Sequence, residues 1–285
     1  MAYTDIDNPE LYFNTKLYTG NGSTQSITGV GFKPDWVWLK NRSTATSHQV
    51  FDIVRGVQKR LYTDSTAGED TSANSLTSFD SDGFSLGSGS STNGSGNSIA
   101  SWNWLAGGSA SSNTDGSITS SVSVSTDAGF SIVSYTGTGS SATVGHGLGS
   151  VPKMVITRNR DTATNWCVYS SEVGNTKALF LNLNNASDTA TQYWNDTTPT
   201  SSVFSVGTNT GTNKSGDGFV AYCFAEKKGY SKFSSYQGSG NSNGPYIHLG
   251  FSPALVIIKN TEGTDNYNIY DNKRLGYNTN YSFLI

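Results

Sequence analysis

Three histidines and a small number of carboxylates are the residues of this sequence that could carry out chemistry. His48, His146 and His248 each lie in a stretch rich in Gly, Ser or Asn, and none has a second His or Cys at the spacing of metal ligands. Residues 145–149, Gly-His-Gly-Leu-Gly, match a turn in an earlier repeat of the chain. The sequence has no P-loop, no Gly-x-Ser-x-Gly elbow and no complete Gly-x-Gly-x-x-Gly. We therefore predict neither a metal site nor a cofactor.

The carboxylates follow the pattern of loops. Asp80 and Asp82 stand in Ser-Phe-Asp-Ser-Asp-Gly, and Asp217 stands in Gly-Asp-Gly, where Asp side chains bond the backbone of turns. A calcium loop needs more closely spaced oxygen donors than the Asp80/Asp82 run supplies. A glycosidase needs two carboxylates at a defined separation, and only a pair assembled in space is left open. We predict that the chain is not an enzyme.

A D-x-x-R pattern occurs twice, as Asp52 with Arg55 and as Asp271 with Arg274. The two copies are 219 residues apart, and the matching residues between them are Ser170 and Val173. A catalytic pair shared by all copies is therefore not expected. The pattern predicts an internal ion pair or a loop staple.

Aromatic side chains could stack on the C–H faces of sugars. The candidates, which lie in less regular surroundings than Trp36 or Trp102, are Trp166, Tyr193, Trp194 and Tyr267. The alternative for each ring is core packing or contact with another subunit.

These residues belong to a sequence that repeats itself. A Tyr-x-Gly-x-Gly turn begins at Tyr18, Tyr135 and Tyr236, at spacings of 117 and 101 residues. A proline and an apolar strand follow each turn, and the prolines Pro34, Pro152 and Pro253 are 118 and 101 residues apart. Repeats of this length are whole modules rather than the units of a solenoid.

The repeats set the expected domains and fold class. We predict an all-β chain of tandem antiparallel β-sandwich modules, jelly-roll or lectin-like, because aromatic and β-branched runs alternate with Gly, Ser and Asn clusters. The first module spans 1–108, the second 129–228, and 109–128 is a linker or connecting strand. Residues 229–285 form the first half of a third module. Either the sequence is part of a longer protein or a neighbouring subunit completes that module.

Two local features leave further expectations. In 36–39 (Trp-Val-Trp-Leu) both faces are apolar, which suits a central strand covered by a second sheet on one side and by loops or a neighbour on the other. Val50, Val54, Val57 and Leu61 follow helical spacing, but the matching stretches of the other modules alternate, so a strand is expected near Val50 and a short helix over 53–59 is the alternative.

Composition narrows the function classes. Charged residues make up 14% of the chain and the net charge is −3 with no basic run, which argues against nucleic acid as a partner. No apolar stretch approaches the ~20 residues of a membrane span. The first residues lack the pattern of a signal peptide. Cys167 and Cys223 are predicted to be buried free thiols rather than a disulfide.

The chain resembles the repeat-module virion structural or tail-fibre-like proteins of tailed, especially marine, bacteriophages. The resemblance rests on the runs at 7–13, 50–56, 81–87, 102–108, 145–149 and 193–196. It implies lectin-like sandwiches without established catalytic residues, and usually a further aromatic strand that closes the third module.

The resemblance implies a virion structural protein, namely a tail fibre, knob or spike that attaches to the host surface. Tandem sandwiches would form a stiff rod on the virion surface, made in the host cytoplasm. The expected partners are other virion proteins, further copies of the chain in a homo-oligomer such as a trimer, and a host surface glycan bound weakly at many sites. The alternatives are a capsid or tail decoration protein and a glycan-binding module of a bacterial surface enzyme.

Overall fold

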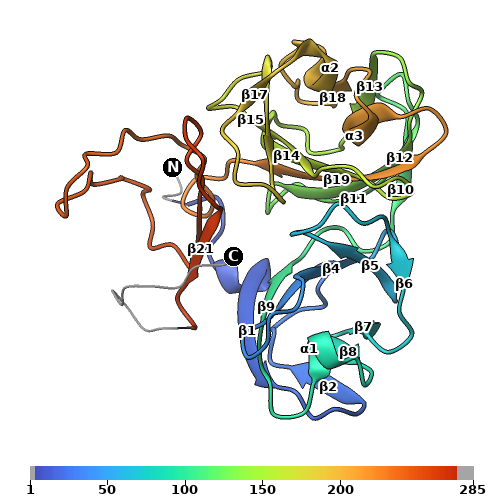
Figure 1. The fold of residues 1–285 in the computed structure, drawn as a ribbon, viewed down its shortest axis with the longest axis vertical. Helices are drawn as coiled ribbons and strands as arrows, with labels where there is room; N and C mark the ends of the chain where they lie inside the picture. The colour runs from blue at the N-terminus through green and yellow to red at the C-terminus, as the bar shows by residue number, and fades with distance from the viewer. Residues whose placement is uncertain (1–3, 275–285) are drawn as a thin grey trace.

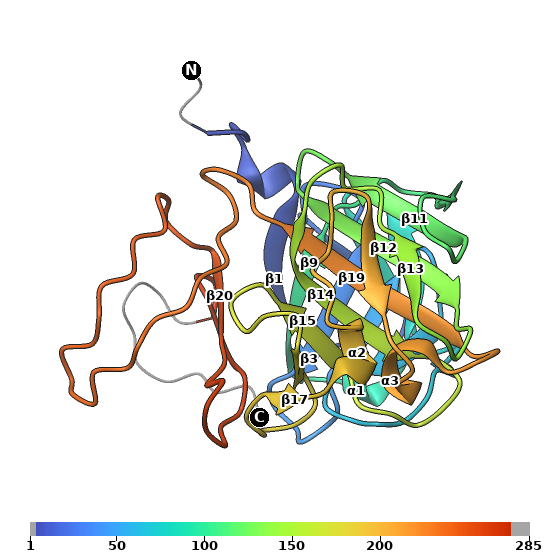
Figure 2. The ribbon, with the colours of Figure 1, turned by 90° about the horizontal axis from the view of Figure 1, so that it is seen from above.

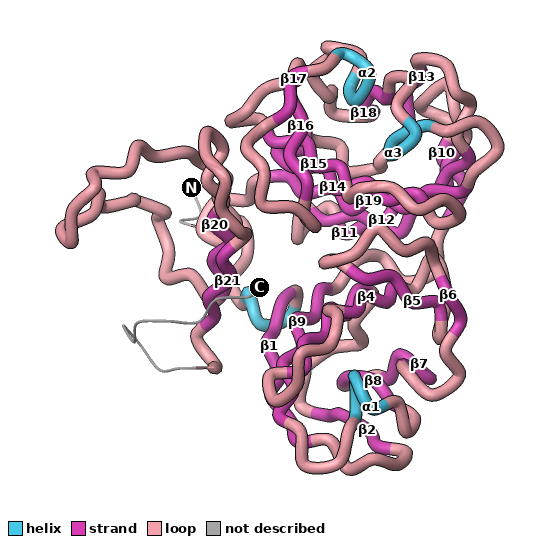
Figure 3. Tube along the Cα trace, viewed as in Figure 1, coloured by secondary structure: helices cyan, strands magenta, loops and turns pink. Residues whose placement is uncertain are grey.

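The computed structural model describes residues 4–274 and contains almost only β-structure (Figures 1 and 3). Every pair of named strands is antiparallel. The helices are one turn long: η1 (Pro9–Leu11), α1 (Ser90–Asn93), α2 (Thr191–Trp194) and α3 (Thr210–Asn213). The all-β prediction with antiparallel sandwich modules is therefore confirmed. Among the described residues, no helix has the length and apolar character needed to cross a membrane.

The first module consists of two sheets. The larger sheet has the order β1-β9-β3-β4-β5-β6 and the smaller one β2-β8-β7. The larger sheet contains β1 (Phe13–Thr19), β9 (Ser98–Trp104), β3 (Trp36–Asn41), β4 (Gln49–Asp52), β5 (Lys59–Tyr62) and β6 (Asp70–Thr71), and the smaller sheet contains β2 (Gln25–Thr28), β8 (Gly83–Leu86) and β7 (Leu76–Asp80). Val37, Leu39, Phe51 and Phe84 are among the buried residues that fill the space between the two sheets.

The second module repeats this plan with extra strands at one edge. Its larger sheet has the order β10-β11-β12-β19-β14-β15-β16-β17, and β13 pairs with β18 in the smaller one. The strands are β10 (Ser111–Asn113), β11 (Ser120–Ser125), β12 (Phe130–Thr136), β19 (Gly218–Ala225), β14 (Pro152–Asn159), β15 (Cys167–Ser170), β16 (Lys177–Phe180), β17 (Asp188–Thr189), β13 (Ala142–Gly145) and β18 (Val203–Val206). The stretch predicted as a linker or connecting strand thus contributes β10 and β11 to the second module's sheet.

The Tyr-x-Gly-x-Gly turn locks the end of each complete module. Tyr18 donates its hydroxyl to the carbonyl of Thr92 in α1 at 2.6 Å, and Tyr135 donates to Thr212 in α3 at the same distance. The first glycine of the turn passes so close to this helical turn that a Cβ atom would meet backbone oxygen, at 2.3 Å for Gly20 and 2.2 Å for Gly137. Only glycine fits there.

The third module contains β20 (Leu255–Ile258) and β21 (Asn268–Asp271), which pair with each other. A repeated Asx turn shows that β20 corresponds to β3 and β14. Asn41 and Asn159 end β3 and β14, and Asn260 lies two residues after β20. The side-chain oxygen of each accepts two backbone N–H groups at 2.9–3.1 Å. Residues 275–285 of the predicted third module lie outside the described residues.

One apolar cluster joins all three modules. One face of the first module's large sheet, with Trp36, Trp38 and Trp102, packs on Phe130, Ile132 and Tyr222 of the second module's large sheet, and Ile269 of β21 joins them. The rings of Trp36 and Tyr222 stack with centroids 4.5 Å apart. The neighbour expected over residues 36–39 is therefore the second module.

This packing corrects the expectation of a stiff rod. The modules lie around a common centre, with β21 beside both large sheets (Figures 1 and 2). The physical reason is the second apolar face of each large sheet, which can leave water only by packing on another module.

Two local expectations are also decided. Residues 49–52 form β4 and residues 53–55 form a turn, so the strand is confirmed and no helix forms over 53–59. Cys167 and Cys223 are buried free thiols, as predicted.

Candidate functional site

The D-x-x-R pattern forms a compact turn at the contact between modules. Asp52 accepts the backbone N–H groups of Val54 and Arg55 at 3.1 and 2.8 Å through one oxygen. Its other oxygen accepts Nε of Arg55 at 2.5 Å, and Nη2 of Arg55 donates to the carbonyl of Val50 at 3.0 Å. Both side chains are fully buried. The predicted ion pair and loop staple are confirmed.

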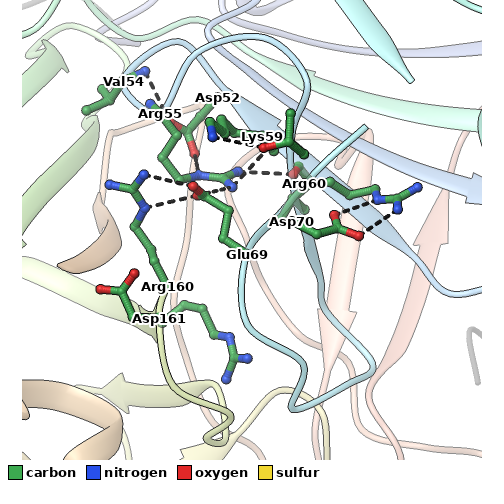
Figure 4. Close-up of polar contacts among 12 residues, drawn as sticks. Asp52, Val54, Arg55, Lys59, Arg60, Glu69, Asp70, Arg160 and Asp161 are labelled. Carbon is green, nitrogen blue, oxygen red and sulfur yellow. Dashed lines mark hydrogen bonds and ion pairs between the residues drawn. The ribbon is translucent and has the colours of Figure 1, made fainter. Parts of the chain in front are cut away.

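The second module completes this cluster (Figure 4). The hydroxyl of Tyr222 donates to Asp52 at 2.7 Å. Glu69 receives Nη1 of Arg55 at 3.2 Å and both Nε and Nη2 of Arg160 at 2.9 Å, so one carboxylate joins two arginines from different modules. Burial opposes charge on Glu69, but the hydrogen bonds and charges of Arg160 and Arg55 outweigh it and lower its pKa.

The third module repeats the same turn against the first module. Asp271 accepts the N–H groups of Lys273 and Arg274 at 3.0 and 2.9 Å, and its second oxygen accepts Nε of Arg274 at 2.5 Å. The indole N–H of Trp102 donates to Asp271 at 3.1 Å, and the guanidinium of Arg274 lies 5.2 Å from the centroid of the Trp102 ring. Trp102 of β9 is the counterpart of Tyr222 of β19, since each lies at the centre of its module's aromatic strand.

A second set of contacts repeats between neighbouring modules. A cation stands six residues after each repeat proline, as Lys40, Arg158 and Lys259. Each holds a loop of its own module, by bonds to the carbonyls of Thr46, Thr164 and Asp265 respectively.

Two of these cations also reach into the preceding module. Arg158 donates to the carbonyls of Thr66, at 2.7 Å, and Ala67 in the first module. Lys259 donates to the carbonyl of Asn184 in the second module at 2.9 Å. A backbone bond accompanies each contact, from Glu69 N–H to Arg160 at 2.6 Å and from Ser187 N–H to Thr261 at 3.0 Å.

The contacts run in cyclic order. A loop of the first module holds the second, and the matching loop of the second holds the third. The D-x-x-R turn of the first module meets Tyr222 of the second, and that of the third meets Trp102 of the first. Heterologous interfaces of one kind form a closed ring when the rotation between units returns to the start. The three modules therefore follow a pseudo-threefold plan (Figure 1). The apolar cluster that they share lies where they meet.

The cations of the ring are not equivalent electrostatically. Burial works against charge on Arg55, but Asp52, Tyr222 and Glu69 raise its pKa above the ordinary value. Arg158 has no carboxylate partner among the described residues, and burial lowers its pKa to about 10, so it stays protonated at neutral pH. Carbonyl oxygens and the face of Trp166, 5.7 Å away, stabilise this cation.

Residues 8–284 match the family model described as a domain of unknown function, DUF7483. The chain belongs to this family. Comparison with curated proteins finds no match, and comparison with solved structures finds none either. The family description assigns no activity, so the site of this DUF7483 chain is interpreted from its geometry.

The four aromatic residues named as candidates for glycan stacking lie at separate places in this DUF7483 chain. Trp166 is fully buried and donates its indole N–H to the carbonyl of Tyr62 in the first module at 2.7 Å. Tyr193 and Trp194 lie in α2, 7% and 2% exposed, within the second module's core. Tyr267 is half-buried beneath Lys259. The structure does not bring the four rings together on an open surface, and the core-packing alternative describes Trp166, Tyr193 and Trp194 better.

The polar residues singled out in the sequence have local structural partners. Asp82 accepts the N–H groups of Gly29 and Gly31 at 2.8 and 2.7 Å, and Asp80 accepts two serine hydroxyls. His146 is buried between Thr200 and Leu148, His48 is buried, and His248 is exposed. Within residues 4–274, no three His, Cys, Asp or Glu side chains gather in a way that could hold a metal ion.

Sequence reasoning missed the cations Lys40, Arg158 and Lys259 and the bridging Glu69. The cations carry a signal, because a Lys or Arg followed by Asn occurs at the same distance from each repeat proline. Glu69 carries none, since its role comes from two arginines that the fold brings to it.

Proposed function

We propose that this DUF7483 chain is a structural protein of a tailed-bacteriophage virion, an appendage that takes part in attachment to the host surface. The observation that carries the proposal is the use of its chemically capable residues. Asp52, Arg55, Glu69 and Arg160 are committed to contacts between modules, which is what a scaffold requires. The sequence resemblance to virion repeat modules supports the same assignment.

The pseudo-threefold plan gives the appendage a compact knob shape rather than a rod. A knob presents its peripheral loops outward while the apolar faces lie inside, and several copies on one particle would add weak contacts into firm attachment. The proposed partners are other virion proteins, further copies of the chain and a glycan of the host surface.

The aromatic side chain available for a glycan in this proposal lies in the third module. Tyr246 is 88% exposed, whereas the rings of the two complete modules are mostly packed. Tyr246 lies in a loop rich in Gly, Ser and Asn, whose amides and hydroxyls suit sugar hydroxyl groups.

Immunogold microscopy of intact phage particles, with antibody against this chain, tests the virion assignment. Label at the tip of the tail or its fibres supports attachment, and label over the shell favours the alternative, a decoration protein. Particles of the source phage that carry no label would refute the proposal.

Binding of the labelled chain to host cells tests the role in attachment. Tyr246→Ala is expected to weaken binding, and the matched control Leu11→Ala, which removes a 49% exposed side chain from another surface, is expected to leave it unchanged. Equal binding by both variants would remove Tyr246 from the contact. Binding to isolated envelope glycan without any virion label would instead favour a glycan-binding module of a bacterial surface enzyme.

A further inference from the structure

The third module lacks, within the described residues, the partner segment that locks the other two. In the first and second modules a helical turn and a strand, residues 90–104 and 210–225, insert between the module's opening strand and its proline strand. β9 lies between β1 and β3, and β19 lies between β12 and β14. Among the described strands, β20 pairs with β21 alone.

The side chains around this position are exposed where their counterparts are buried. Ile257 of β20 is 38% exposed, whereas the matching Trp38 and Ile156 are 3% and 5% exposed. Tyr236 is 48% exposed, whereas its counterpart Tyr135 is 4% exposed with its hydroxyl on α3. The side chains exposed in the third module are therefore the counterparts of those that the inserted segment covers in the other two modules.

The first glycine of the Tyr-x-Gly-x-Gly turn shows the same difference between the third module and the other two. A Cβ atom on Gly20 or Gly137 would collide with the backbone of the inserted helical turn, but a Cβ atom on Gly238 would meet nothing within 4 Å. The sequence keeps a glycine where the described structure does not yet require one.

We propose that the third module binds a polypeptide segment consisting of a helical turn followed by a β-strand, built like residues 90–104 and 210–225. The strand adds to the free edge of β20, and the helical turn accepts the hydroxyl of Tyr236. The segment continues the established interfaces, because its central side chain pairs with Ile257 as Trp102 pairs with Trp38 and Tyr222 with Ile156.

Residues of the second module determine which side chain the bound segment can carry at its centre. Tyr222 meets Asp52 and Trp102 meets Asp271, but the corresponding positions of the second module are Ser170 and Val173, both half-buried. A carboxylate acceptor is therefore absent from these two positions. The central side chain of the segment is an aromatic or aliphatic group that needs no anionic partner, and an acidic residue there is excluded by desolvation.

A peptide with the sequence of residues 90–104, which contains no cysteine, tests the proposal when it is added to the chain of residues 1–285. Calorimetry is expected to show one bound peptide per chain, and hydrogen exchange is expected to slow at residues 231–236 and 255–258. The peptide with Phe at its Trp102 position is expected to bind as well as the parent, and the peptide with Asp there is expected to bind at least about tenfold more weakly.

Gly238→Ala is the decisive variant, and Gly244→Ala is its matched control. Both positions have open space around them in the described structure, so neither change should disturb folding. Gly238→Ala should weaken peptide binding at least about tenfold, because its methyl group collides with the arriving helical turn, while Gly244→Ala should bind like the parent.

Three outcomes would overturn the proposal: no binding, equal binding by the two glycine variants, or exchange protection confined to other strand edges such as β6 and β17. Self-association of the chain that Gly238→Ala abolishes, without any peptide binding, would assign the surface to a second copy. This test is independent of the virion assignment, which rests on the particle and cell experiments.

Discussion

The hydroxyl of Tyr222 donates a 2.7 Å hydrogen bond to the carboxylate of Asp52, although the two residues are 170 positions apart and belong to different modules. The indole N–H of Trp102 makes the corresponding bond to Asp271. The same contact, from an aromatic donor to the Asp of a D-x-x-R turn, therefore occurs twice between modules. The D-x-x-R turn is present at both places where it receives such a donor from another module.

Asp52→Asn is expected to destabilise the chain strongly. The change removes the charge that compensates the fully buried Arg55, and breaking a buried ion pair costs about 3–5 kcal/mol. Urea unfolding gives the difference. Asp70→Asn, which breaks a partly exposed pair with Arg60, is the control and should cost less than about 1 kcal/mol. Equal costs for the two variants would contradict the role of Asp52 at the interface.

Trp102→Phe is expected to loosen the third module selectively. The variant loses the bond to Asp271, whereas the matched variant Trp38→Phe loses an equally buried indole whose N–H has no hydrogen-bond partner. Hydrogen exchange at 255–271 should accelerate in Trp102→Phe and change much less in Trp38→Phe. The same acceleration in both would mean that general packing, and not the hydrogen bond, holds the third module.

Arg158→Lys is expected to be tolerated, because Lys40 and Lys259 occupy the corresponding positions and hold carbonyls in the same way. Arg158→Met should be costly, by about 1–3 kcal/mol for each buried carbonyl left without a donor. Thermal unfolding of the two variants separates these cases. A Lys variant as unstable as the Met variant would show that the planar guanidinium is essential.

His146 is expected to make stability depend on pH below neutrality. Its Nδ1 accepts the N–H of Leu148 at 3.2 Å, and its Nε2 lies 3.2 Å from the carbonyl of Thr200, so the ring is neutral. Burial lowers the pKa of His146 below its ordinary 6.5, although Thr200 and Asp115 act in the opposite direction.

Between the pKa of His146 in the folded chain and its ordinary pKa of 6.5, the unfolded chain therefore binds more protons than the folded one. The stability that comes from the neutral ring is complete above pH 6.5 and is lost as the pH falls toward the lowered pKa. His146→Gln should flatten the dependence of the unfolding temperature on pH as the pH falls below 6.5. His248→Gln, at an exposed position, serves as the control and should keep the parent's slope.

Glu69 should act in a more acidic range. Its pKa is lowered from the ordinary 4.5 by Arg160 and Arg55, against the effect of burial. The stability that ionised Glu69 adds is therefore complete above pH 4.5 and is lost as the pH falls through the lowered pKa. Glu69→Gln is expected to lower stability at pH 7 and to approach the parent as the pH falls well under 4.5, which acid titration of unfolding measures. An unchanged difference across this range would exclude ionised Glu69 as the bridge between the modules.

Local patterns in the sequence are enough to predict the repeat, the all-β class, the strand at Val50 and the D-x-x-R staple. These follow from local patterns: alternation, turn residues and the bonds that an Asp makes to the next few residues. The buried free cysteines followed in the same way, from their place inside apolar strands.

The packing of the modules against one another determines what covers the second face of each large sheet, and local patterns do not encode this packing. It therefore also determines which of the reactive side chains are buried. The irregular surroundings of Trp166 in the sequence leave glycan stacking and core packing both open, and the first module buries this side chain completely. Glu69 bridges Arg55 and Arg160, which are 105 residues apart in the chain. A contact between such distant residues produces no repeating pattern in the sequence. Local propensity is encoded within a few residues, whereas burial depends on which distant surfaces arrive to exclude water.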